Sequence, residues 1–242
     1  MRRRIAKLTV TALLAFAALI ALGTWQVERL HWKEGLIAAR AAALAAPPAE
    51  LPTSLEAARK LEFRRVRASG VFLYDHEFPV NGTEKESGQA GYLLVTPLRR
   101  ADGSVLLVDR GWIPWDRRDP ASRAAGNPAG TVEVAGLLRI PSDGKPGWFV
   151  PDNDPRKNQW FYVDPAAMGR AAGVSVLPFY IDAGPASNPG GYPLGGQTNM
   201  ELPNNHLQYA ITWYSLAGVL VVIYLLMLRR ERAASATPTS RP

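Results

Sequence analysis

Two long stretches without a charged residue, one near each end of the chain, constrain the fold more than any other feature. The first covers residues 8–27 and the second residues 207–228. An α-helix rises about 1.5 Å per residue, so about 20 apolar residues cross a hydrocarbon core of about 30 Å. The pattern therefore predicts a membrane protein in which two transmembrane α-helices, at these residues, flank one extracytoplasmic domain.

The first stretch has a second interpretation. A basic start followed by an apolar run that ends at Ala21, Leu22 and Gly23 is also typical of a cleaved signal peptide. Trp25 follows, where aromatic side chains anchor helices at the membrane interface. The second stretch is followed at once by Arg229 and Arg230, which is a stop-transfer pattern. From the residues alone, both interpretations of the first stretch stay open.

Basic residues predict the orientation, because they are enriched on the cytoplasmic side of membrane spans. No lysine or arginine occurs between residues 173 and 206, before the second stretch. We expect both termini, including the tail 229–242, in the cytoplasm and the central domain, residues 28–203, in the periplasm of a bacterial inner (plasma) membrane. The basic residues that flank the two stretches are Arg2, Arg3, Arg4, Lys7, Arg229, Arg230, Arg232 and Arg241.

The net charge of +7 comes entirely from these flanks. Eight of the 28 basic residues and one of the 21 acidic residues lie there, so residues 8–228 are neutral overall. A protein that binds nucleic acid needs a basic face on its folded part. We therefore expect membrane lipid, and no nucleic acid, as a partner. The chain has no cysteine, which excludes disulfides, thiolate nucleophiles and cysteine-bound metals.

The central domain is expected to be mainly antiparallel β, as a sheet or a small barrel, in an α+β arrangement. A helix over residues 28–46 should continue the first span until Pro47 and Pro48 end it. A hairpin turn is predicted at Asp102 and Gly103, and a short helix at residues 165–173. The glycine- and proline-rich composition of residues 182–203 predicts a linker. Short β-rich runs predict strands at residues 63–74, 77–80, 92–99, 105–109, 131–138, 159–163 and 179–181.

The outer ends of both spans carry aromatic and ionisable residues at helical spacing. Trp25, Arg29 and either Trp32 or Lys33 share one face, as an interface belt or as a cationic clamp for an anionic group. Three further residues, His206, Tyr209 or Ala210, and Trp213, also share a face, which places an imidazole above an aromatic ring. His206 is thus either a ligand or a helix cap.

Taken together, three segments of the chain resemble the Surfeit locus protein 1 family, the assembly factors of cytochrome c oxidase. The family keeps its first span, so the resemblance favours a retained helix over a signal peptide. The domain departs at Asp109, where the family often has asparagine. The matching residues are Gly23, Trp25, Gln26 and Arg29; Gly91, Tyr92, Thr96, Pro97, Arg110, Gly111 and Trp112; and Asn205, His206, Leu207, Tyr209, Ala210, Thr212 and Trp213.

The resemblance implies a carrier that binds heme A at the membrane boundary and helps to insert it into oxidase subunit I, with subunit I and the heme A synthesis enzymes as partners. His206 would be the axial ligand of the heme iron, and Asn204 or Asn205 would orient its ring. The remaining implied contacts are stacking by Trp213 and Trp25 and propionate binding by Arg29 or Lys33.

Two other functions were weighed. An enzyme is disfavoured, because the three histidines stand near no nucleophile-elbow pattern and His76 lies between Asp75 and Glu77. A scaffold that stabilises oxidase subunits without touching heme is permitted by the same motifs, and the absorption spectrum of the purified protein would distinguish it from a carrier.

Overall fold

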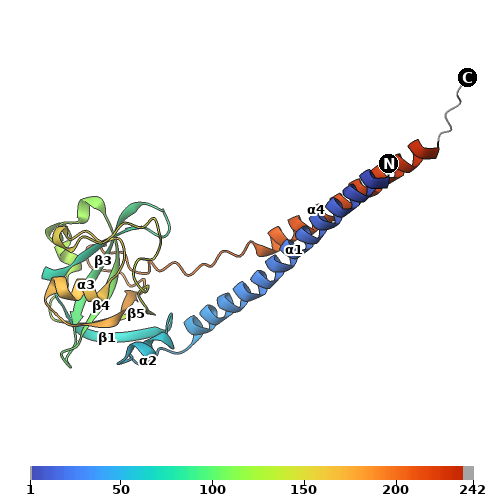
Figure 1. Cartoon of the computed structure of the whole chain (residues 1–242). Helices are drawn as coiled ribbons and strands as arrows, with labels where there is room; N and C mark the ends of the chain where they lie inside the picture. Colours follow the sequence, from blue (N-terminus) through green and yellow to red (C-terminus); the bar gives the residue numbers. More distant parts are fainter. Residues whose placement is uncertain (1, 237–242) are drawn as a thin grey trace, which may run out of the picture. The chain divides into compact units, whose positions relative to one another are not determined.

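The computed structural model describes residues 2–236 and divides the chain into two compact units (Figure 1). One unit, Met1–Ala39 with Glu201–Pro242, has two long helices among its described residues, and we call it the helix pair. The other, Arg40–Met200, is a β domain. The two apolar stretches thus belong to one unit although more than 160 residues of chain separate them, since that unit is built from both ends of the sequence.

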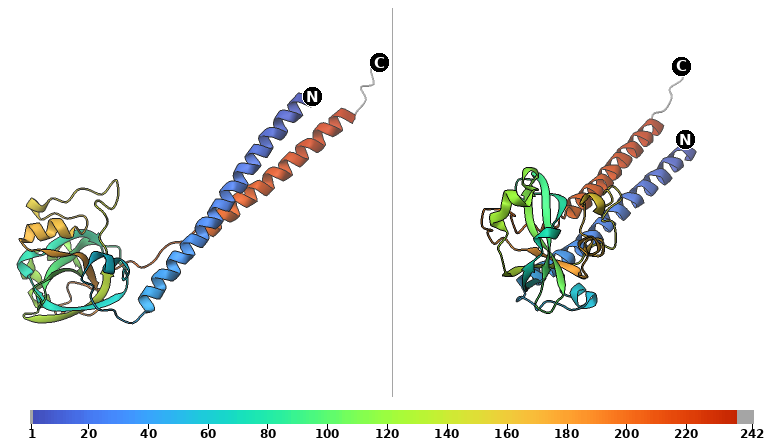
Figure 2. Two further views of the ribbon diagram at one scale, coloured as in Figure 1. Left: turned by 60° about the horizontal axis from the view of Figure 1, so that its bottom comes forward. Right: turned by 90° about the vertical axis from the view of Figure 1, so that its left-hand side faces the viewer.

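The helix pair contains α4 (His206–Ala236) and all but the last six residues of α1 (Arg2–Ala45). Each is long and apolar enough to cross a membrane, with a mean hydropathy of 2.2 in its most apolar window. The helices lie side by side and antiparallel, since Thr9 Oγ1 is 2.7 Å from the Tyr224 hydroxyl and Thr24 Oγ1 is 3.3 Å from that of Tyr214 (Figure 2). The predicted helix over residues 28–46 is confirmed as the continuation of α1.

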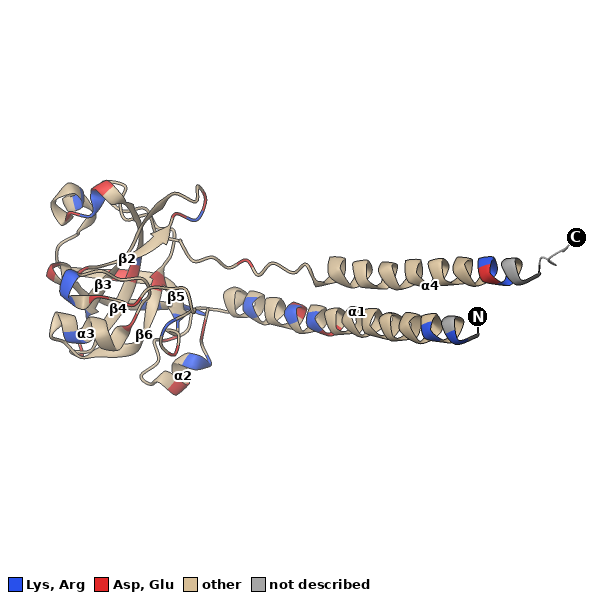
Figure 3. Cartoon of the chain, turned by 45° about the horizontal axis from the view of Figure 1, so that its top comes forward, with Lys and Arg blue, Asp and Glu red and all other residues tan. Residues whose placement is uncertain are grey.

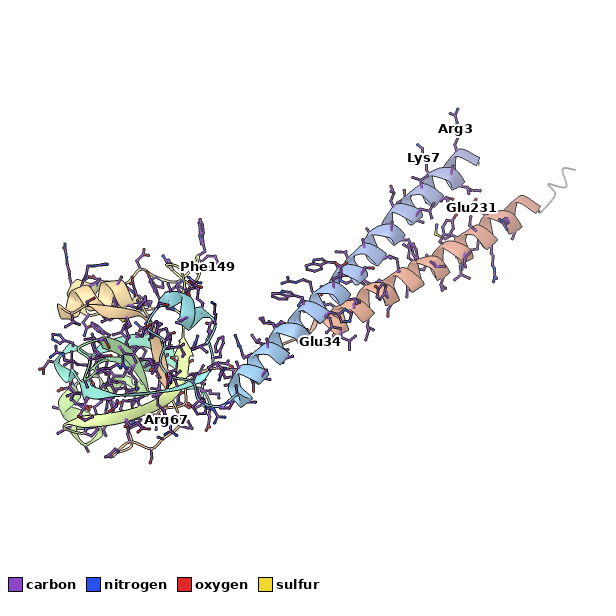
Figure 4. The ribbon with its side chains drawn as sticks, turned by 90° about the horizontal axis from the view of Figure 1, so that it is seen from below. Arg3, Lys7, Glu34, Arg67, Phe149 and Glu231 are labelled. Atoms are coloured by element: carbon purple, nitrogen blue, oxygen red, sulfur yellow. The ribbon has the colours of Figure 1, made fainter. Side chains whose placement is uncertain are left out.

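Charged side chains avoid the middle of the helix pair. Figure 3 shows a run of uncharged residues along α4 and along the N-terminal half of α1. Arg3, Lys7 and Glu231 lie at the same end of the pair (Figure 4). Leucines in this run, such as Leu13 and Leu14, are exposed. An apolar surface of this kind suits lipid rather than water as its surroundings.

Small residues let the two helices approach closely. Ala210 and Ala217 of α4 are each 2% exposed, and an added Cβ at Gly23 would lie 2.6 Å from the Tyr214 ring. Helices in membranes associate through such close packing, because lipid tails supply no hydrophobic driving force between them. Gly23, one of the residues typical of a signal-peptide end, therefore has a packing role against α4.

The β domain holds one six-stranded sheet in the order β1-β5-β6-β4-β3-β2, and β1 also pairs with β3. The sheet therefore curls into a barrel-like ring of five strands, with β2 beside β3. Five pairings are antiparallel, but β4 and β6 are parallel. The strands are β1 (Arg65–Phe72), β2 (Phe78–Thr83), β3 (Ala90–Arg99), β4 (Val105–Pro114), β5 (Thr131–Arg139) and β6 (Val176–Ala183).

The expectation of a mainly antiparallel sheet was therefore incomplete, because the sheet is mixed. Residues 140–175 connect β5 to β6, and a connection of this length lets β6 enter between β5 and β4 in either direction. The predicted hairpin at Asp102 and Gly103 is confirmed between β3 and β4. The predicted short helix is α3 (Pro165–Ala172), which ends at Gly173 in the left-handed conformation with φ 67°.

The strand expected at residues 159–163 was wrong. Trp160 forms only an isolated bridge to Val80, and its carbonyl accepts hydrogen bonds from the backbone and the side-chain amide of Asn81. Trp160 is fully buried and packs edge-on against Phe78 at a centroid distance of 5.2 Å. The β-rich composition of this segment thus reflects a side chain that fills the core rather than a strand.

The domain is held together by two apolar clusters and one buried ionic cluster. Phe179 and Trp160 are fully buried members of the two apolar clusters. In the ionic cluster, Glu77 accepts hydrogen bonds from Arg110 on β4 (2.9 Å) and from Arg123 (3.0 Å), and all three side chains are almost completely buried. Two guanidinium groups thus share one carboxylate, and the cluster fixes the loop that carries Arg123 against β4.

Candidate functional site

His206 and Gln26 face each other across the helix pair. Nδ1 of His206, the first residue of α4, lies 2.7 Å from Oε1 of Gln26 on α1. Gln26, near the end of the first apolar stretch, is a polar side chain that is only 9% exposed. The His206 imidazole is partly buried. The hydrogen bond joins the C-terminal end of the first apolar stretch to the N-terminal end of the second, so the two helices must both be present to form this site.

The contact determines which ring nitrogen carries the proton. A carbonyl oxygen only accepts hydrogen bonds, so Nδ1 is the donor. A neutral imidazole with its proton on Nδ1 keeps a lone pair on Nε2, which is the nitrogen free to bind a metal. Histidines that ligate metals generally donate their other N–H to a fixed acceptor in this way. The geometry is therefore compatible with a ligand role for Nε2 of His206.

The other predicted residues lie on the same two helices. Trp213 is partly buried and lies on the face of α4 that also carries His206 and the buried Ala210. Trp25 is 50% exposed. The Arg29 guanidinium stacks 4.1 Å from the centroid of the Trp32 ring, which also lies on α1. Of the two residues expected to share a face with Trp25 and Arg29, Trp32 is the one that contacts Arg29.

Asn204 and Asn205 lie immediately before α4. We expected one of them to orient the imidazole of His206, but the hydrogen-bond partner of His206 Nδ1 is Gln26. The Asn205 carbonyl accepts the first helical hydrogen bond, from the Tyr209 N–H at 3.2 Å, so Asn205 occupies the N-cap position. Among the residues that the structure describes, Asn204 Oδ1 is buried without a hydrogen-bond partner. A ligand or a water molecule can supply the missing donor.

Gln26 is the residue that the sequence analysis missed as a site residue. It was named only as part of a motif, although it is a strongly polar amide at the end of a twenty-residue apolar stretch. A buried amide there needs a partner, because an unsatisfied polar group in an apolar environment is costly. That cost is the signal that could have identified it.

Arg110, Gly111 and Trp112 lie in the second half of β4 and have a packing role. Trp112 N–H donates to the Leu194 carbonyl at 2.9 Å and its own carbonyl accepts from Leu194 N–H at 2.8 Å, so β4 holds the linker that leads toward α4. Gly111 adopts φ 121°, which disfavours any residue with a side chain. This segment therefore belongs to the architecture of the β domain.

In the same part of the sheet, Asp109 on β4 and Asp182 on β6 are register partners, and both are buried. Asp182 accepts hydrogen bonds from Arg139 (2.6 Å) and Thr198 (2.7 Å), whereas Asp109 accepts from the Gly111 N–H at 2.9 Å. Burial and the charge of Asp182 raise the pKa of Asp109 from 3.8 to about 7. Asp109 thus keeps its proton to a higher pH than an exposed aspartate does, and a neutral asparagine of the same shape suits this position.

We expect Asp109→Asn to flatten the dependence of stability on pH. Below pH 3.8 the folded and the unfolded wild type both bind the Asp109 proton. As the pH rises toward 7, the unfolded chain releases this proton before the folded chain does. The free energy of unfolding of the wild type therefore falls over this range. At about 1.4 kcal/mol per pKa unit, the loss is limited to about 4 kcal/mol. In thermal melts the variant should therefore gain on the wild type between pH 4 and pH 8. Equal gain by Asp75→Asn, at an exposed carboxylate, would contradict this account.

Comparison with known proteins gives a consistent result. The model of the SURF1 family matches residues 13–218, which include both Gln26 and His206. A SURF1-like protein from Monosiga brevicollis is 41% identical over 233 residues, covering 91% of this chain and 88% of the relative. Surfeit locus protein 1 of Homo sapiens is 38% identical over 212 residues, covering 81% and 69%. Since the family model spans most of the chain and both relatives exceed 30% identity over most of their lengths, the chain belongs to the SURF1 family.

Proposed function

We propose that this protein is a two-pass membrane assembly factor for cytochrome c oxidase that binds heme A at the outer ends of its helices and passes it to subunit I. The observation that carries the proposal is the hydrogen bond from His206 Nδ1 to Gln26 Oε1. Membership of the SURF1 family supports the assembly role. The activity is binding and transfer, and it requires no catalytic residue.

The residues around His206 fit a heme. The iron of heme accepts a neutral imidazole as an axial ligand, and Nε2 of His206 carries the lone pair that this bond needs. Partly buried Trp213 and half-exposed Trp25 offer ring faces on which a flat macrocycle can stack. A single axial bond also suits a carrier, because the cargo must be released to its acceptor.

Charge and lipid complete the proposed site. Arg29 and Lys33 lie beyond the last uncharged turn of the first stretch, where a guanidinium or ammonium group can bind a propionate. The apolar surface of the helix pair is a suitable environment for the farnesyl tail of heme A. Asn204 Oδ1, a buried acceptor close to His206 along the chain, would receive a donor from the bound molecule or from water.

The absorption spectrum of the purified protein tests the proposal. The chain is expressed with the enzymes that synthesise heme A and is purified in detergent. A Soret band that copurifies with the protein at a fixed ratio supports a carrier. A colourless protein that still binds oxidase subunits would instead identify a scaffold that acts without heme.

Replacing Gln26 by leucine is expected to weaken heme A binding by about 10- to 100-fold, the usual cost of losing the partner of a metal-bound histidine. Without the acceptor at Nδ1, the imidazole loses its fixed tautomer and orientation. Heme titration measures the affinity, and resonance Raman spectroscopy of the iron–histidine stretch reports the bond itself. Gln208→Leu, at an exposed position of α4, is the matched control and should leave both readouts unchanged.

Reporter fusions test the proposed orientation. A cytoplasmic reporter fused after Arg232 should be active, and a reporter that works only outside should be active when inserted at residues 186–191. The reason is the excess of basic residues before the first stretch and after the second, because basic residues are retained on the cytoplasmic side. Exchanged activities of the two reporters would mean that the protein is inserted the other way round.

A further inference from the structure

Two adjacent aromatic side chains on the β domain are almost completely exposed. Trp148 is 92% and Phe149 96% exposed, the highest values among the large hydrophobic residues that the structure describes. Figure 4 shows Phe149 at the rim of the domain, pointing away from its body. Adjacent aromatic rings left in water point to a surface that they contact in the working state of the protein.

The loop that carries this pair is ordered by its own contacts. Val150 N–H donates to the Gly147 carbonyl at 3.2 Å, so Trp148 and Phe149 occupy the two central positions of a tight turn. Lys145 Nζ pairs with Asp152 Oδ1 at 3.0 Å and closes the base of the loop. We call residues 145–152 the aromatic turn. Because the turn is already folded, the pair can be buried elsewhere without the cost of ordering the loop.

Further contacts fix the ends of the turn to the domain. The Asn153 side chain accepts from Phe161 N–H at 2.8 Å and donates to the Tyr162 carbonyl at 3.2 Å, next to the core residue Trp160. Pro146 and Pro151 restrict the backbone on either side of the pair. The two rings are therefore presented at a defined place on the domain.

We propose that the aromatic turn inserts into the interfacial layer of the bilayer and so sets the orientation of the β domain on the membrane. The inference rests on the proposed two-pass topology, in which spans at both ends of the domain tether it to the bilayer. Tryptophan is enriched at the membrane interface, where its ring and its N–H meet apolar and polar surroundings together. Within the aromatic turn Lys145 and Asp152 are paired, so the turn carries no net charge that opposes its contact with the headgroup layer.

A protein partner fits the turn less well. A stable protein–protein interface buries about 800 Å² on each side and uses about 20–30 residues. Here two rings project from a narrow turn whose neighbours are glycine, proline and valine, and Asp152 at its base is paired with Lys145. A fluid interface can close around so small a projection, whereas a rigid protein surface would need a pocket shaped for it.

A fluorophore placed beside the two rings tests the insertion. The chain lacks cysteine, so Gly147→Cys gives a single labelling site, and its Cβ would meet only Val150 Cγ2 at 3.5 Å. The full chain is labelled with an environment-sensitive dye and reconstituted in nanodiscs that contain anionic lipid and spin-labelled quencher lipid. We expect blue-shifted emission that the quencher lipid reduces, and loss of both effects in the Trp148→Ser, Phe149→Ser background. The same dye at Ser87→Cys, in the exposed turn between β2 and β3, is the positional control.

Three results would overturn the inference. Aqueous emission at residue 147 with a correctly inserted chain means that the turn does not meet lipid. Shielding that appears only when oxidase subunits are added identifies a protein-docking turn instead. Failure of the chain to integrate into the nanodisc, shown by its extraction at alkaline pH, overturns the two-pass topology and the inference with it.

Discussion

Replacing His206 by alanine should produce the largest functional change, in which heme A loses its axial bond while the protein remains inserted and folded. The Soret and α bands should shift and the heme content should fall. Occupancy need not reach zero, because stacking on the aromatic rings and the farnesyl tail in lipid are unaffected by the change. Difference spectra and a heme assay of the purified protein measure both quantities.

The two other histidines supply matched controls. His31 lies on an exposed part of α1, and His76 is exposed in the β domain. Their alanine variants should keep the wild-type spectrum and stoichiometry. If His206→Ala also binds heme A with an unchanged spectrum, the ligand assignment is wrong and the scaffold function becomes the better explanation.

The largest expected loss of stability follows from Glu77→Gln. The change keeps the shape of the side chain but removes the charge that Arg110 and Arg123 share, so two buried guanidinium groups lose their counter-ion. Breaking a buried ion pair in this way costs about 3–5 kcal/mol. For a chain of this size, the unfolding midpoint of the β domain should fall by about 6–20 °C. Near-UV circular dichroism reports this unfolding through buried Trp112 and Trp160.

Glu133→Gln is the control, because it makes the same carboxylate-to-amide change at an exposed ion pair. Glu133 pairs with Arg67 at 3.3 Å, but both side chains are exposed, and such pairs contribute about 0–1 kcal/mol. Its midpoint should stay within about 4 °C of the wild type. A similar fall in both variants would indicate that the burial of Glu77 does not determine its contribution.

Much of the fold could be predicted because the signals are local. An uncharged stretch of twenty residues, a pair of prolines at residues 47 and 48 and a glycine after α3 act on their own segments, and they predicted α1, its end and α3. Strand order was beyond reach, because long connections such as residues 140–175 leave the partner and direction of β6 open. Trp160 misled the strand assignment since core-filling and strand-forming residues are the same types.

Residue patterns alone indicate two apolar stretches able to span a membrane, the absence of cysteine chemistry, the motifs of one family and a histidine at the start of the second stretch. What that histidine contacts depends on how the two helices pack. Gln26 is 180 residues away in the chain and meets His206 because Gly23, Ala210 and Ala217 let α1 and α4 pack closely. A hydrogen bond between residues so far apart in the sequence depends on how the two helices pack, and local sequence patterns do not encode that packing.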